Sequence, residues 1–160
     1  MKIRSATLCA GLGLVFAVTT GSSWAAETID VSLWDHPGVP MATDLPLGAT
    51  LPDPAMAAMG ITVSAATAPV GEITFNVTND GDLIHEMIVI PVASATASLP
   101  YDPATLTVDE DAAGALGEVE ELQPHTSGSL TLHLPSGTYV LICNVPGHYA
   151  GGMWAILTVQ

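Results

Sequence analysis

Short runs in which apolar and polar residues alternate, each bounded by a turn signal, constrain the fold of this chain most. Residues 61–65 and 73–77 alternate in this way on either side of Pro69-Val70-Gly71, and residues 129–134 alternate with their leucines on one face. A period of two residues places one face of a strand in the core and the other in solvent. Helical periodicity is nearly absent, so the pattern predicts an all-β fold.

Further strand patterns follow at regular spacing. They cover residues 29–33, 83–90, 138–143 and 154–159. Asn79-Asp80-Gly81-Asp82 is a strong turn signal ahead of the second of them. Many short strands separated by turns predict a Greek-key β-sandwich.

Two segments interrupt the alternation. Residues 35–60 are rich in Pro, Ala, Met and Gly, and residues 92–124 open with two prolines and pass through the acidic stretch 109–111. We expect the first to be an irregular N-terminal crossing and the second to be one long connection, with its acidic stretch in a solvated loop. No repeat or composition break indicates a second domain.

The first 25 residues have the pattern of a secretory signal. Lys2 and Arg4 precede an apolar stretch, residues 8–18, and Ser23-Trp24-Ala25 offers small residues for cleavage. The stretch is shorter than the roughly 20 residues of a membrane span. We expect residues 1–25 to be a signal peptide and residues 26–160 to be a single exported domain, periplasmic or extracellular. An uncleaved N-terminal anchor is the alternative.

Cleavage would leave a domain without any cationic side chain. Lys2 and Arg4 are the only Lys or Arg residues, and all 16 Asp and Glu residues lie after residue 25, so the formal net charge would be −16. Such a surface repels phosphates, which excludes nucleic acid as a partner. The acidity fits a basic partner protein, a saline environment or simple solubility.

Cys143 would be the only thiol of the exported domain, because Cys9 belongs to the signal segment. An intramolecular disulfide is then impossible. A lone thiol in an oxidising compartment is either a buried structural residue or occupied by a ligand.

The surroundings of this cysteine favour an occupied thiol. The eleven-residue stretch CNVPGHYAGGM places the thiol of Cys143, the imidazole of His148 and the thioether of Met153 in one loop. These are three of the ligands of a blue-copper site, which needs a second histidine. His85 is the best candidate, because it shares a face with apolar side chains of its predicted strand.

The two segments that carry these residues resemble the cupredoxins. GEITFNVTNDGDLIHEMIVIP is similar to the half that supplies the first histidine, and LPSGTYVLICNVPGHYAGGMWAILTV is similar to the C-terminal hairpin with its ligand loop. The C-x4-H-x4-M spacing resembles that of rusticyanin, auracyanin and sulfocyanin. The resemblance implies one type 1 copper ion held by His85, Cys143 and His148, with Met153 as the weak axial ligand. The chain departs from the family at Glu86, where an Asn often ties the ligand segments together.

The resemblance further implies a one-electron carrier and not an enzyme, with no small-molecule substrate. We expect a monomer whose redox partner proteins dock at the apolar end around His148. The apolar patch expected there consists of Val145, Pro146, Tyr149, Ala150 and Gly151. A copper carrier or buffer without redox cycling would use the same ligands and is the alternative. A copper enzyme is disfavoured, because the chain lacks a second domain and a second set of histidines.

Overall fold

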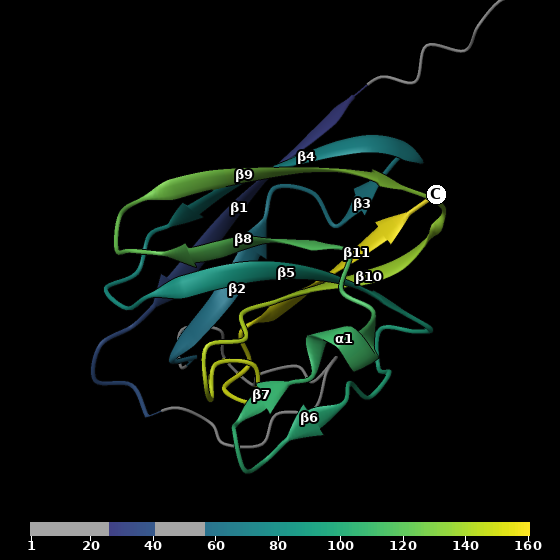
Figure 1. The fold of residues 1–160 in the computed structure, drawn as a ribbon. Helices are drawn as coiled ribbons and strands as arrows, with labels where there is room; N and C mark the ends of the chain where they lie inside the picture. Colours follow the sequence, from purple (N-terminus) through teal and green to yellow (C-terminus); the bar gives the residue numbers. More distant parts are fainter. Residues whose placement is uncertain (1–25, 41–56) are drawn as a thin grey trace, which may run out of the picture.

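The computed structural model describes residues 26–40 and 57–160. The expected signal peptide and most of the expected N-terminal crossing lie outside these residues. The described part consists mainly of strands in two stacked sheets, which confirms the predicted β-sandwich (Figure 1). Within the described ranges, no helix is both long enough and apolar enough to cross a membrane.

The first sheet has the strand order β2-β1-β4-β9. Its strands are β1 (Glu27–Asp35), β2 (Met59–Val63), β4 (Gly71–Asn79) and β9 (Ser127–Leu134). β1 is antiparallel to β2 and parallel to β4. The two alternating segments that flank Pro69-Val70-Gly71 therefore both pair with β1 and not with each other.

The second sheet has the order β3-β11-β10-β5-β8. Its strands are β3 (Thr67–Ala68), β5 (His85–Val92), β8 (Gly117–Leu122), β10 (Gly137–Ile142) and β11 (Trp154–Val159). The prediction of a connection running to residue 124 is wrong over its last part, because β8 is a strand at the edge of this sheet. Only Val119 of β8 is buried, and its glutamates face solvent, as is common in edge strands.

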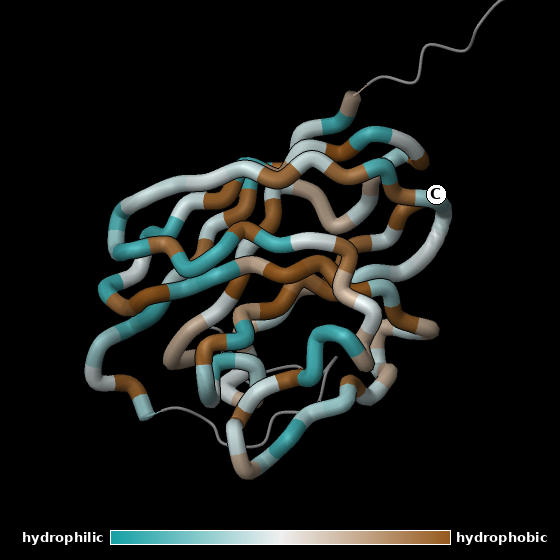
Figure 2. The backbone as a smooth tube through the Cα atoms, in the orientation of Figure 1, coloured by the Kyte–Doolittle hydropathy of each residue, from teal (hydrophilic) through white to brown (hydrophobic). Residues whose placement is uncertain are grey.

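Two apolar cores lie on opposite faces of the second sheet. Met87 and Val89 of β5 pack between the two sheets against residues such as Phe75. Ile88 and Ile90 point the other way, into a smaller core under β6 (Tyr101–Asp102), β7 (Thr107–Val108) and α1 (Glu110–Ala113). β5 is thus buried on both faces, which explains its continuous apolar sequence. Figure 2 shows apolar residues along the central strands and hydrophilic ones on α1.

The acidic stretch 109–111 does not form the expected loop. Asp109 caps the N-terminus of α1 by accepting a hydrogen bond from the Ala112 N–H, and Glu110 and Asp111 form the first turn. Carboxylates at this end of a helix complement the partial positive charge of its free N–H groups. Gly114 ends the helix in the left-handed conformation.

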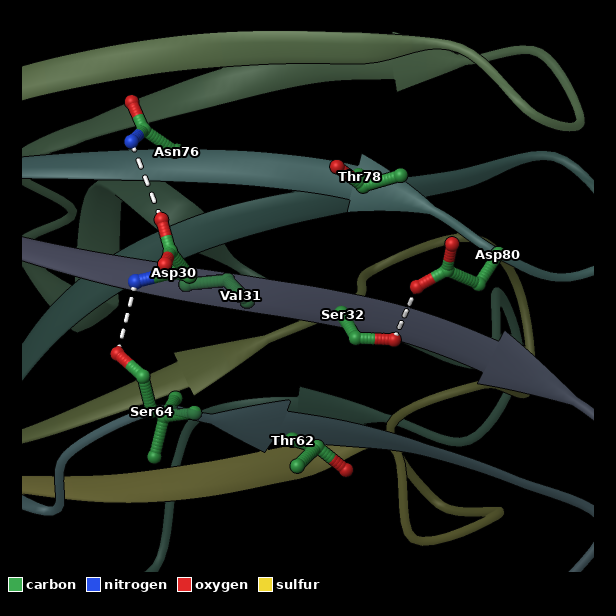
Figure 3. Close-up of a pocket in the computed structure, with 9 residues that line it drawn as sticks. Asp30, Val31, Ser32, Thr62, Ser64, Asn76, Thr78 and Asp80 are labelled. Atoms are coloured by element: carbon green, nitrogen blue, oxygen red, sulfur yellow. Dashed lines mark hydrogen bonds between the residues drawn. The ribbon is translucent and has the colours of Figure 1, made fainter.

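The outer face of the first sheet carries a polar groove (Figure 3). Asp30 of β1 accepts a hydrogen bond from the side chain of Asn76 at 3.1 Å and donates its own N–H to Ser64 Oγ at 2.9 Å. These bonds link β1 to both of its neighbours. Asp30 is therefore a surface carboxylate on the same strand as Asp35, which faces a different environment.

Candidate metal centre

Strand ends of the second sheet bring the predicted ligands to one edge of the sandwich. His85 begins β5, Cys143 directly follows β10, and Met153 directly precedes β11. The Cys143 N–H donates to the Met153 carbonyl at 3.1 Å, and the Met153 N–H donates to the His148 carbonyl at 3.0 Å. The loop between the two strands is thus folded back on itself, with His148 held above its base.

Glycines give the loop this tight course. Gly147 and Gly152 have φ values of 89° and 97°, which favour glycine. The Gly151 N–H donates to the Gly147 carbonyl at 2.9 Å. A Cβ on Gly151 would lie 3.2 Å from the carbonyl oxygens of Gly147 and His148, so a larger residue would push the turn away from the histidine.

Three buried donor atoms converge at this edge. Nδ1 of His85 lies 3.2 Å from Nδ1 of His148, and Sγ of Cys143 lies 3.9 Å and 3.4 Å from these two nitrogens. Nitrogen ligands at about 2.0 Å and a sulfur ligand at about 2.3 Å around one tetrahedral ion are separated by about 3.3–3.6 Å. The three residues are at most 6% exposed and form the one His/Cys/Asp/Glu cluster of metal-binding geometry among the described residues.

Met153 is the fourth donor predicted from the sequence. Its side chain is fully buried in the main core together with Cys143. A thiolate, two imidazoles and a thioether form a soft, mixed set that suits copper better than zinc, magnesium or calcium. The residues present therefore fit one type 1 copper ion.

Burial determines the protonation of the donors. It raises the pKa of Cys143 to about 12, and burial together with the neighbouring His85 lowers the pKa of His148 to about 4. Burial also lowers the pKa of His85, against the opposing effect of Asp35. At neutral pH both imidazoles are neutral and can act as ligands, whereas the thiol must lose its proton when a cation binds.

Asp35 is hydrogen-bonded to the far nitrogen of His85. Its Oδ1 lies 2.9 Å from His85 Nε2 and accepts the N–H groups of Asp82 and Leu83 at 2.9 Å and 3.0 Å. Burial opposes ionisation of this carboxyl, but the hydrogen bonds from Leu83, His85 and Asp82 together hold its pKa below the usual value. Asp35 is therefore an ionised, buried partner of a predicted ligand.

Asn79 fixes the turn that carries these amides. It is fully buried, its side-chain NH₂ donates to the carbonyls of Leu83 and Leu122, and its Oδ1 accepts the Gly81 N–H. The turn signal at residues 79–82 is thus confirmed, and it has a structural role beside the site.

Replacing Asn79 by Ala is expected to destabilise the protein by about 2 kcal/mol, because buried backbone groups lose their partners. Chemical denaturation of the metal-free protein measures this cost. Asn76→Ala is the matched control, since Asn76 is exposed and its side chain donates to the exposed Asp30. Equal costs for the two variants would contradict the role given to Asn79.

Glu86 ties the two ligand segments together. Its Oε1 accepts the Asn144 N–H at 3.0 Å, and its own N–H points to Cys143 Sγ at 3.5 Å. The departure from the family pattern at this position is thus compensated by a longer carboxylate side chain. Burial, followed by the charge of Glu110, raises the pKa of Glu86 to about 7.

Asn144 connects the ligand loop to the segment of β6, β7 and α1 that covers the second sheet. Its side chain accepts the Val108 N–H at 2.6 Å and donates to the Val108 carbonyl at 3.0 Å and to Glu110 Oε1 at 2.8 Å. The Gly147 N–H also donates to the Leu106 carbonyl at 2.9 Å. The hairpin of β6 and β7 therefore braces the ligand loop from outside.

Only part of the expected apolar patch reaches the surface. Pro146 is exposed and Val145 is half-buried, whereas Tyr149, Ala150 and Gly151 are buried. Leu106, which is 46% exposed, adds an apolar side chain beside the loop. Leu106 could not be assigned to this surface from the sequence, because it lies 40 positions before Pro146 in the chain.

Sequence comparisons match the C-terminal part of the chain most clearly. A model of the sulfocyanin (SoxE) domain matches residues 117–160. Auracyanin-B of Chloroflexus aurantiacus is 38% identical over 71 residues, which are 44% of this chain and 30% of that protein. The chain thus spans less than a third of the length of this curated relative.

Structural comparisons extend the similarity over most of the fold. Rusticyanin from Thiobacillus ferrooxidans has a TM-score of 0.53 at 17% identity, covering 86% of this chain and 80% of that one. Auracyanin B has a TM-score of 0.50 at 22% identity, covering 84% of this chain and 89% of that one. At such identities, these structures define the fold alone.

The β-sandwich and its structural neighbours give the chain the cupredoxin fold, in which His85, Cys143 and His148 converge in a geometry that could hold a metal ion. Its C-terminal part is similar in sequence to the sulfocyanin domain and to Auracyanin-B.

Proposed function

We propose that this protein is an exported one-electron carrier with a single type 1 copper ion. His85, Cys143 and His148 are its strong ligands and Met153 is the weak axial one. The observation that supports the proposal best is the convergence of three buried donor atoms whose spacing suits one ion. Residues 1–25 act as the export signal, and residues 26–160 form the functional domain.

The ligand residues are suited to electron transfer because they are held in place by their own loop and sheet. Bound copper would supply the one-electron couple between Cu(I) and Cu(II). Rigid ligands limit the rearrangement between these two states, and the contact of the Glu86 N–H with the Cys143 sulfur tunes the electron density on that thiolate. His148, 6% exposed against 0% for His85, is the ligand nearer the surface and provides the route for the electron.

Visible absorption and EPR spectra of the protein with added Cu(II), followed by cyclic voltammetry, test the proposal. An intense thiolate-to-copper band and a reversible one-electron wave are expected. Copper uptake without a reversible wave would favour the alternative of a copper carrier or buffer. A protein that takes up no copper would contradict both functions and leave Cys143 as a structural thiol.

Redox partners are proposed to dock at the end of the sandwich where Leu106 and Pro146 are exposed. The described surface is strongly acidic, so a basic partner is favoured. An apolar centre surrounded by charge is the usual arrangement of a transient interface.

Leu106→Asp is expected to slow electron transfer to a basic haem protein by about fivefold, corresponding to about 1 kcal/mol of lost docking energy. Leu106 has a φ of 62°, a conformation that Asp tolerates, so the fold should be retained. Stopped-flow mixing at low ionic strength gives the rate.

Leu116→Asp is the matched control for this experiment. Leu116 is 44% exposed, and its replacement by Asp adds the same charge. Its N–H donates to the carbonyl of Val89, four positions along β5 from His85, so this control lies away from the donor end of the sandwich. Equal effects of the two variants would show that overall charge, and not a docking surface at Leu106, sets the rate.

A further inference from the structure

We propose that Asp35 is the positioning residue of the metal centre, because its carboxylate holds the Nε2–H of His85 and leaves Nδ1 of that ring free to act as a ligand. The role in copper binding rests on the proposed function, whereas the control of the imidazole tautomer does not. Asp35 lies 50 positions before His85, and neither motif nor spacing connects them in the sequence.

The hydrogen bonds at one oxygen atom assign the proton on the ring. Oδ1 of Asp35 accepts two backbone N–H groups, from Asp82 and Leu83, and lies 2.9 Å from His85 Nε2. Backbone amides can only donate, so Oδ1 is an acceptor and Nε2 must be the donor. A neutral imidazole carries one N–H, and Nδ1 therefore presents its lone pair toward Cys143 and His148.

The pair is also enclosed. The side chain of Asp35 is 4% exposed and that of His85 is fully buried. Gly81 packs against both groups, and a Cβ there would overlap Asp35 Oδ1 and lie 3.0 Å from His85 Nε2. Such packing prevents the carboxylate from turning away and prevents water from replacing it.

Asp35 further links the two sheets at the edge where the donors converge. It is the last residue of β1 in the first sheet, whereas His85 is the first residue of β5 in the second. The other donors lie on the second sheet with His85, so this hydrogen bond joins the donor cluster to the first sheet. The hydrogen bond therefore fixes the rotation of the ring relative to the first sheet.

A carboxylate on the far nitrogen makes an imidazole a stronger ligand. A buried negative charge also favours the more positive of two metal states. Asp35 should therefore strengthen the binding of Cu(II) more than that of Cu(I), and so lower the reduction potential.

The experiment compares Asp35→Asn with Asp35→Ala in two assays. In the metal-free protein, ¹⁵N NMR of the His85 ring reports which nitrogen carries the proton. In the copper-loaded protein, the affinities for Cu(II) and Cu(I) and the potential are measured. Asp30→Asn is the matched control, because it removes the same charge from the same strand at the outer groove shown in Figure 3.

We expect the Nε2–H tautomer in the wild type and in Asp35→Asn, since the amide oxygen can still accept the hydrogen bond, and a mixture of tautomers in Asp35→Ala. Asp35→Asn should bind Cu(II) about tenfold more weakly while Cu(I) binding changes little. A tenfold change in the ratio of the Cu(II) and Cu(I) affinities corresponds to a reduction potential about 59 mV higher. Asp30→Asn should change neither quantity.

A wild-type His85 that carries its proton on Nδ1 would overturn the proposal. An unchanged potential in Asp35→Asn would overturn it as well, and would leave Asp35 with the structural role of binding the amides of Asp82 and Leu83. If the wild type takes up no copper, the proposed function fails, and the tautomer of His85 in the metal-free protein alone supports or overturns the positioning role.

Discussion

Replacing Cys143 by Ser is expected to abolish the thiolate-to-copper absorption of the copper-loaded protein. It should also weaken Cu(II) binding by more than roughly 10–100-fold, which is the usual cost of losing a residue that only hydrogen-bonds to a metal ligand. Serine is close to cysteine in size, and its hydroxyl remains protonated where a thiol beside a metal ion is ionised. The fold should survive, because a hydroxyl at this place can hydrogen-bond to the nearby Nδ1 of His148.

Absorption spectroscopy with a Cu(II) titration measures both effects. Met87→Leu is the matched control, because Met87 is fully buried on the core-facing side of β5 with His85, and its volume is retained in the variant. Its spectrum should keep the intense band. A band that persists in Cys143→Ser would remove the thiolate from the site, and with it the type 1 assignment.

Three of the proposed donor residues could be selected from the sequence because they lie close together in it. Cys143, His148 and Met153 share one loop between two alternating strands, so their chemistry can be read from a single stretch. His85 was the harder assignment, and it depended on a polar residue being out of place on an apolar strand face. The structure brings His85, Cys143 and His148 together.

Residues that support the ligands could not be predicted in the same way. Asp35 and Glu86 act through hydrogen bonds that span 50 and 58 positions, to His85 and to the Asn144 N–H respectively. The first contact depends on how the two sheets stack and the second on which strands pair, and local periodicity carries no information on either. Nothing in the sequence distinguishes the carboxylate that binds His85 from the other acidic residues, of which the chain has 16 in all.

The alternating pattern did not predict β8, because this strand lies at the edge of its sheet. β8 reads GEVEEL and has only Val119 buried, so its sequence resembles a solvated loop. Among the described strands it pairs with β5 alone, and charged side chains on an edge strand disfavour pairing with another chain. β5 shows the opposite case. Its apolar residues do not alternate with polar ones, because the segment of β6, β7 and α1 covers its second face.

Gly81→Ala is expected to destabilise the protein by about 4 kcal/mol, the sum of overpacking and of buried donors that lose their acceptor. The new methyl group would overlap Asp35 Oδ1 and come within 3.0 Å of His85 Nε2. Gly81 is buried, so the methyl group cannot move into solvent. The carboxylate would be displaced, and with it the acceptor for His85. Urea denaturation of the metal-free protein measures the loss. Gly137→Ala is the control, since a Cβ there meets the Tyr139 ring at an ordinary 3.5 Å.

A double-mutant cycle shows whether the cost arises at the Asp35 carboxylate. In the Asp35→Ala background the overlapping oxygen is absent, so Gly81→Ala should cost less by about 2 kcal/mol, within the range of coupling between residues in contact. The coupling should be near zero between Gly137→Ala and Asp35→Ala. If the costs of Gly81→Ala and Asp35→Ala were simply additive, the carboxylate would not be confined by this glycine, and the precise placement of His85 would need another cause. A measured coupling would instead mean that Gly81 helps to keep His85 in position. It would do so by confining the Asp35 carboxylate to the one place from which it accepts the hydrogen bond of His85.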